Sequence, residues 1–107
     1  MPDPAIHTPR APGAPIPGDA ALEHLLSAEG LAPHWWSNEG GYRYQLHVHG
    51  YHKVLYCASG SVTLTLPATG EQFRLRPGDR VDLPPNTGHT AMVGPEGVRC
   101  VEGWKPV

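Results

Sequence analysis

From residue 42 onward, apolar and polar side chains alternate in short runs that are separated by glycines and prolines. Because successive side chains of an extended strand point to opposite faces, this period of two predicts half-buried strands. The runs cover residues 42–49, 53–59, 61–66, 72–76, 80–84, 90–93 and 98–104. No helical stretch separates them, which argues against a parallel βαβ arrangement. The pattern therefore predicts an all-β fold, either a sandwich or a small barrel.

The N-terminal part of the chain has a different composition. Residues 1–18 contain six prolines and two glycines, which is typical of an extended arm with too few apolar residues to order itself. Residues 19–29 (DAALEHLLSAE) predict one short helix that Asp19 caps and Gly30 ends. We therefore expect a Pro-rich arm over residues 1–18, which is dispensable for folding. One domain, with the helix included, should cover residues 19–107.

Charge and composition limit the partners and the compartment. Eight Lys and Arg residues against ten Asp and Glu residues give a net charge of −2, which argues against a general binder of nucleic acid or anionic membranes. No run approaches the roughly 18 apolar residues of a membrane span, and no signal peptide is visible, so we expect a cytoplasmic protein. In that compartment Cys57 and Cys100 should be reduced and buried, with a disulfide between them as the alternative.

Three histidines have positions that suit a metal ion. His47 and His49 are two residues apart in a predicted strand, so their imidazoles point to the same side of the sheet. His89 follows a rigid turn at residues 84–88 (PPNTG), which would hold it at the mouth of a barrel. Imidazole is a common ligand of divalent metals. The pattern indicates a candidate metal site, and the alternative for His47 and His49 is a solvated strand face.

These two features together resemble the two motifs of the cupin superfamily. The first motif is a glycine, a spacer, His-x-His, a glutamate after three or four residues and a glycine six residues later. The second is a glycine, then proline, glycine, histidine and asparagine at fixed spacing. The matching positions here are Gly41, His47, His49, Lys53 and Gly60 for the first motif, and Gly78, Pro84, Asn86, His89 and Val93 for the second. The resemblance covers about residues 40–103. It implies a double-stranded β-helix, or jelly-roll barrel, with a metal site inside that His47, His49 and His89 form.

Lys53 departs from this pattern, because the family has a metal-binding glutamate at that position. Three alternatives follow. A three-histidine metal site can remain, with Lys53 neutral or turned aside to hold an anionic substrate. The Lys53 ammonium can instead take the place of the metal in a metal-free pocket. In the third alternative a bulge turns His52 inward as an additional metal ligand.

The strand at residues 42–49 also predicts other pocket residues and an interface. Arg43 and Gln45 alternate with the histidines on one face, so we expect them to line the pocket together with Lys53, a solvated face being the alternative. The other face carries an apolar row of Tyr42, Tyr44, Leu46 and Val48. One short helix is too small to cover such a row. We therefore expect a second copy of the chain to cover it, which gives a homodimer.

The predicted function is divalent-metal binding inside the barrel, with a small polar or anionic molecule as ligand or substrate. Zn, Fe, Mn and Ni are all compatible with three histidines. If the protein is an enzyme, open positions on such a metal suit dioxygenase or isomerase chemistry. The alternative is a non-catalytic small-molecule-binding module whose pocket is metal-free, with Lys53 in the metal position. We predict no nucleic-acid partner and no membrane partner.

Overall fold

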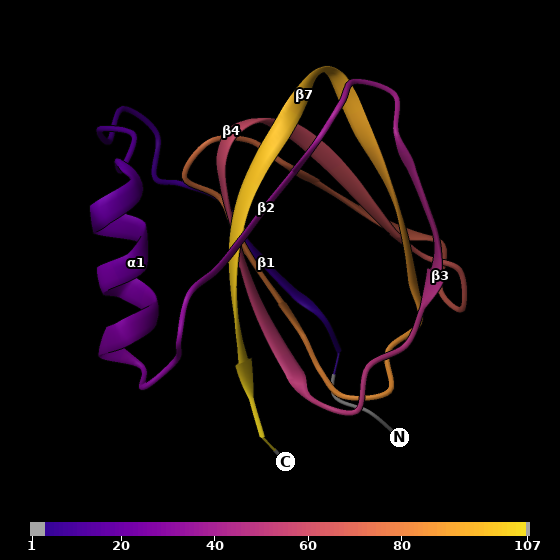
Figure 1. The fold of residues 1–107 in the computed structure, drawn as a ribbon. Coiled ribbons are helices and arrows are strands. Elements are labelled where there is room, and N and C mark those ends of the chain that lie inside the picture. The colour runs from indigo at the N-terminus through magenta and orange to yellow at the C-terminus, as the bar shows by residue number, and fades with distance from the viewer. Residues whose placement is uncertain (1–3, 107) are drawn as a thin grey trace.

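A computed structural model describes residues 4–106 of the 107-residue chain. Within these residues, one helix and seven strands follow one another along the chain. The elements are β1 (Ile6–Thr8), α1 (Asp19–Ala28), β2 (His34–Asn38), β3 (Arg43–His47), β4 (His52–Leu66), β5 (Glu71–Leu75), β6 (Arg80–Leu83) and β7 (His89–Lys105). The strands form one antiparallel sheet that curves into a barrel, and α1 packs outside it (Figure 1). The predicted all-β barrel with one short helix is confirmed.

Strands β4 and β7 are the longest strands, and they pair with each other along most of their length. Strand β4 also pairs with β5 and β6, and β7 also pairs with β2 and β3. Each of the two contains a pair of the runs seen in the sequence, because the glycines between the runs bend the strand without ending it. At Gly60, whose φ is +72°, an added Cβ would lie 1.9 Å from the carbonyl oxygen of Gly97. Only glycine fits this bend of β4.

The alternation along β4 divides the apolar residues between two clusters. Inside the barrel, β4, β5, β6 and β7 contribute the larger cluster: Leu55, Cys57, Val62, Leu64, Leu66, Leu75, Val81, Leu83, Val93, Val98 and Cys100. Outside it, residues of α1 and of the adjoining strands form the smaller cluster: Leu22, Leu26, Leu31, Val54, Tyr56 and Val101. The helix therefore covers one outer face of the barrel, and burial of its leucines holds it there.

Helix α1 differs in detail from its prediction. It ends at Ala28, and Gly30, with φ +77°, follows as the expected stop signal. The predicted cap is wrong, because the N-cap residue is Gly18, which has no side chain to bind the first backbone N–H groups. Asp19 lies in the first turn and accepts hydrogen bonds from the Arg99 guanidinium of β7. Its carboxylate therefore links the start of the helix to the barrel.

The Pro-rich arm contains a strand that the sequence pattern did not predict. Strand β1 pairs with β6, and Thr8 lies opposite Arg80. The backbone N–H of Arg10 donates to Oδ1 of Asp79 at 2.8 Å, and Asp79 is buried. Asp79 thus ties the arm to the barrel.

Two further expectations concern the cysteines and the membrane. Cys57 and Cys100 are register partners on β4 and β7, and both are free and buried, as predicted. Among the described residues, no helix is both long and apolar enough to cross a bilayer.

Candidate functional site

The barrel contains a cavity of about 250 Å³. Its polar lining residues are Tyr44, His47, His49, Lys53, His89 and Glu102. Its apolar lining residues are Trp36, Leu55, Val62, Leu64, Leu83 and Ala91. Pockets for drug-sized ligands measure about 300–1,000 Å³, so this cavity suits a smaller molecule. The mixed lining suits a molecule that carries both a polar and an apolar group.

The three predicted histidines meet in this cavity. His47 ends β3 and lies opposite His89, which begins β7. His49 lies in the loop after β3, where its carbonyl oxygen accepts a 2.7 Å hydrogen bond from the backbone N–H of Asn86. The ring centroids are 6.0 Å apart for His47 and His49, 6.2 Å for His47 and His89, and 5.4 Å for His49 and His89. The structure therefore brings together the two histidines of the His-x-His pair and the histidine after the turn.

A bulge in β3 changes which of its other residues reach the cavity. The register with β7 shifts between Tyr44 and His47, so both of these side chains face inward although they are three residues apart. The prediction that Arg43 and Gln45 line the pocket is wrong, because both are exposed and neither belongs to the cavity wall. Strict alternation along the strand fails at the bulge. Because of the bulge, Tyr44 faces the cavity and does not belong to the apolar row that the alternation predicts.

His89 is the most constrained of the three histidines. Its side chain is buried, and its Nδ1 lies 3.1 Å from the carbonyl oxygen of Thr87. A carbonyl only accepts, so Nδ1 carries the proton and Nε2 keeps a free lone pair. Burial lowers the pKa of His89, and the nearby charge of Lys53 lowers it further, whereas the Thr87 carbonyl opposes the change. His89 is therefore a neutral imidazole at neutral pH.

Lys53 lies in the cavity, as the alternation predicts. Its Nζ is 3.4 Å from Nε2 of His49 and 3.6 Å from Oε2 of Glu102. The pKa of His49 is lowered, first by burial and then by the charge of Lys53. A neutral His49 can direct the lone pair of its Nε2 at the ammonium group. Lys53 is thus the cation that accompanies the histidines in this structure.

Glu102 is a cavity residue that the sequence analysis missed. It lies on β7 opposite Leu55, which makes it a diagonal neighbour of Lys53 on the inner face of the sheet. The Trp36 indole N–H donates to its Oε1 at 2.8 Å, and the Trp104 indole N–H donates to its Oε2. The sequence does contain a signal for this position. In the run at residues 98–104, Glu102 alternates in phase with residues of the inner core. A carboxylate at such a position has to be paired or hydrogen-bonded.

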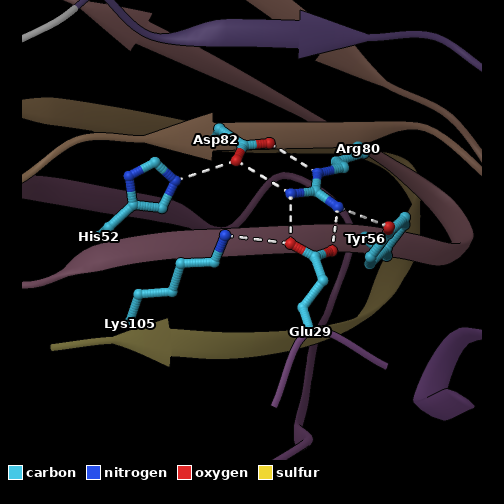
Figure 2. Close-up of polar contacts among 6 residues, drawn as sticks. All are labelled: Glu29, His52, Tyr56, Arg80, Asp82 and Lys105. Carbon is cyan, nitrogen blue, oxygen red and sulfur yellow. Dashed lines mark hydrogen bonds and ion pairs between the residues drawn. The ribbon is translucent and has the colours of Figure 1, made fainter. Parts of the chain in front are cut away.

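His52 lies on the other face of β4, away from the cavity. The register with β7 is continuous from His52 to Cys57, so the alternative in which a bulge turns His52 inward is wrong. Its Nε2 is 2.9 Å from Oδ2 of Asp82. Figure 2 shows that Asp82 also binds Arg80, which reaches Glu29 just after α1. His52 therefore belongs to a group of charged residues that joins the helix to the outside of the barrel.

The histidines and Lys53 together decide whether a divalent metal fits this site. Three imidazoles on one metal, each bound at about 2.1 Å, have ring centroids about 5 Å apart. The observed separations are 5.4 to 6.2 Å, and within the described part of the chain no three His, Cys, Asp or Glu side chains are already arranged around one point as metal ligands. A small rotation of the rings would close the difference, provided that the Lys53 ammonium moves away from His49. With that movement the donor set fits a divalent metal.

Comparison with known proteins agrees with the barrel and the cavity. The family model of the AraC-like ligand binding domain matches residues 37–104, which is more than half of the chain. These residues include all three histidines, Lys53 and Glu102. Among curated proteins, none matches the sequence.

Several solved structures share the fold. An RmlC-like cupin from Shewanella frigidimarina has a TM-score of 0.62 at 23% identity, over 72% of this chain and 67% of that chain. A double-stranded beta-helix domain protein from Klebsiella pneumoniae has a TM-score of 0.61 at 26% identity, over 70% of this chain and 66% of that chain. The DMSP lyase DddQ from Ruegeria pomeroyi has a TM-score of 0.64 at 21% identity, over 70% of this chain and 38% of that chain. The protein is thus a cupin-type barrel, and it belongs to the family of AraC-like ligand-binding domains.

Proposed function

We propose that this ligand-binding domain binds a small molecule next to a divalent metal ion that His47, His49 and His89 hold. The observation that carries the proposal is the convergence of three imidazoles in one cavity of the barrel. The fixed tautomer of His89 supports it, because a histidine whose Nδ1–H donates to a carbonyl offers Nε2 as the ligand atom. The lowered pKa values of His49 and His89 support it as well, because only neutral imidazole binds a metal.

A metal ion at this position would act as a Lewis acid with open positions for a small ligand. The residues of the chain would then bind the rest of the ligand. Lys53 turns away from the three histidines and offers a positive charge to the ligand. Leu64 and Leu83 offer apolar contacts to the rest of the ligand. One solved relative is named a DMSP lyase, and catalysis of dioxygenase or isomerase type stays a prediction for this chain.

A second candidate function is metal-free ligand binding, and the position of Lys53 favours it. The ammonium lies between the imidazole of His49 and the carboxylate of Glu102, so one resident cation already occupies the histidine end of the cavity. In this alternative the three histidines serve as hydrogen-bonding groups for the ligand. Both candidate functions involve the same cavity, and both are compatible with membership of a ligand-binding family. They differ in whether metal is retained.

Metal content of the untagged protein separates the two candidates. We expect close to one divalent metal per chain by elemental analysis after dialysis against a metal mixture of Zn, Fe, Mn and Ni. His47→Ala, His49→Ala and His89→Ala should each lower the content at least fivefold. His24→Ala, on the exposed side of α1, is the matched control and should leave it unchanged. Equal metal content in wild type and all three cavity variants would contradict the metal proposal.

The remaining partner and compartment assignments are also proposals. We propose a homodimer that forms through the exposed apolar residues of β3 and the strand beside it. We propose a cytoplasmic location with no nucleic-acid partner, on the charge balance of the chain.

A further inference from the structure

We infer that the cavity takes a small monocarboxylic acid with a short apolar chain, and that Lys53 binds its carboxylate. The inference deepens the proposed small-molecule site and depends on it, but it does not require the metal ion. It combines three features of the cavity: the unused donors of Lys53, the position of Glu102 and the apolar lining residues.

Lys53 has more hydrogen-bonding capacity than its neighbours use. A lysine ammonium has three N–H donors, and strong N–H···O contacts measure about 2.7–3.2 Å. Among the described residues, the polar neighbours of Nζ are His49 at 3.4 Å and Glu102 at 3.6 Å, which are both beyond that range. The side chain is only 13% exposed, so water has limited access to the ammonium. A buried cation held this loosely favours an anion that can approach more closely.

Glu102 is held in place by partners of its own. Each of its two oxygens accepts an indole N–H, from Trp36 on one side and Trp104 on the other. These hydrogen bonds favour the observed position of the carboxylate, with Oε2 at 3.6 Å from Nζ of Lys53. Glu102 therefore orients Lys53 without occupying all three of its donors, and the ammonium can still bind the carboxylate of a ligand.

Tyr44, which lies opposite Ala91 of β7, offers a second donor to the cavity. The side-chain N–H of Asn38 donates to the Tyr44 hydroxyl oxygen, so the hydroxyl hydrogen remains free to donate. Tyr44 lines the cavity together with Lys53. An ammonium and a hydroxyl that both donate suit an acceptor-only group such as a carboxylate, and they suit a cation poorly.

The apolar lining residues limit the rest of the ligand. Half of the lining residues are apolar, and Val62, Leu64 and Ala91 among them offer no hydrogen bond to a sugar-like molecule from their side chains. At the roughly 30 Å³ that a water molecule takes in the liquid, the cavity of about 250 Å³ has room for about eight non-hydrogen atoms. Hexanoate has eight such atoms, so it is a suitable probe, and hexanamide is its neutral counterpart of the same shape.

Calorimetric titration of both probes tests the inference, on the protein as purified and after treatment with EDTA. We expect wild type to bind hexanoate at least tenfold more tightly than hexanamide. Lys53→Met should remove this preference, whereas Arg43→Met, which removes an exposed cation outside the cavity, should keep it. Glu102→Gln should tighten hexanoate binding at least threefold, because it removes the negative charge nearest to the ligand.

Three outcomes would overturn the inference: equal binding of the two probes by wild type, an unchanged preference in Lys53→Met, or no binding of either probe at millimolar concentration. The comparison of hexanoate with hexanamide uses wild type alone, so it holds even if a variant fails to fold. Metal content measured on the same samples keeps the two proposals apart. Hexanoate binding by a protein that retains no metal even after dialysis against the metal mixture contradicts the metal proposal only, and metal without hexanoate binding contradicts this inference only.

Discussion

Lys53 and Glu102 place opposite charges on neighbouring strands of the cavity, and each limits what the other can do. The cupin pattern has its carboxylate on the strand after the His-x-His pair, where this chain has Lys53. Here the carboxylate comes from β7, where two indole N–H groups hold it. A metal ion at the histidines would therefore meet a cation on one strand and an immobile anion on the next. This exchange makes Lys53 the residue that decides metal affinity.

Lys53→Glu should raise the affinity for divalent metal at least tenfold. The change removes a positive charge next to His49 and adds a carboxylate at the position of the family's fourth ligand. We would measure the affinity by competition with a coloured chelator at pH 7.5. Arg43→Glu makes the same change of charge at an exposed position and should alter the affinity less than threefold. Affinity that stays the same or falls in Lys53→Glu would show that Lys53 does not oppose the metal.

The buried His89 should make stability depend on pH. Burial lowers its pKa in the folded state, so between the folded pKa and the unfolded value of about 6.5 the unfolded chain binds more protons. The contribution of His89 to the free energy of unfolding is therefore complete above about pH 6.5 and decreases as the pH falls below it. Urea denaturation at pH 7.5, 6.5 and 5.5, in the presence of EDTA, would measure this.

His89→Asn is the comparison for that experiment, because asparagine can keep the hydrogen bond to Thr87 without titrating. Its free energy of unfolding should decrease less steeply below pH 6.5 than that of wild type. Slopes of equal size in both proteins would show that His89 is not the group responsible.

At the scale of secondary-structure elements, the docked arm changes what truncation should do. Strand β1 completes the edge of β6, and the Arg10 backbone binds the buried Asp79. A chain that starts at Gly18 loses these contacts and leaves one oxygen of Asp79 without its partner, which costs about 1–3 kcal/mol. We now expect a melting temperature lower by at least about 5 °C, contrary to the dispensable arm that composition suggests.

A side-chain control distinguishes backbone pairing from other effects of the arm. Ile6→Thr changes an exposed side chain of β1 and preserves its extended backbone, so it should alter stability by less than about 0.5 kcal/mol. A truncated chain that melts at the wild-type temperature would restore the original expectation.

The elements also show what the sequence could and could not reveal. The barrel, the helix and the meeting of His47, His49 and His89 follow from the alternation of residues, the turn signals and the two motifs. The bulge after Tyr44 has no such signal, because a one-residue change of register depends on pairing with β7. Strand β1 was hidden for a related reason: its pairing with β6 depends on tertiary contacts that proline content does not reveal.

At the scale of the whole molecule, several large apolar side chains around β3 remain exposed. Tyr42, Leu46, Val48 and Met92 are each 40–60% exposed, just before β3, on it, in the loop after it and on β7 beside it. Helix α1 covers a different face of the barrel, so the predicted need for a second subunit stands. Sedimentation equilibrium should give about twice the 11.5 kDa of one chain.

Leu46→Asp should convert this dimer to monomer, because it places a charge in the middle of the apolar surface. Leu25→Asp introduces the same charge at an exposed position of α1, away from that surface, and should leave the dimer intact. A wild-type mass of 11.5 kDa at every concentration would contradict the dimer.

The three tryptophans give this barrel built-in optical reporters on both sides of its wall. Trp36 and Trp104 donate to the same carboxylate at the cavity, whereas Trp35 donates to Glu23 of α1 on the outside. Indole emission depends on the local electric field and on the indole hydrogen bond. Filling the cavity should therefore change the emission of Trp36, which lines it, and of Trp104 through the shared carboxylate, more than that of Trp35, so the occupancy of the cavity can be followed by light without a label.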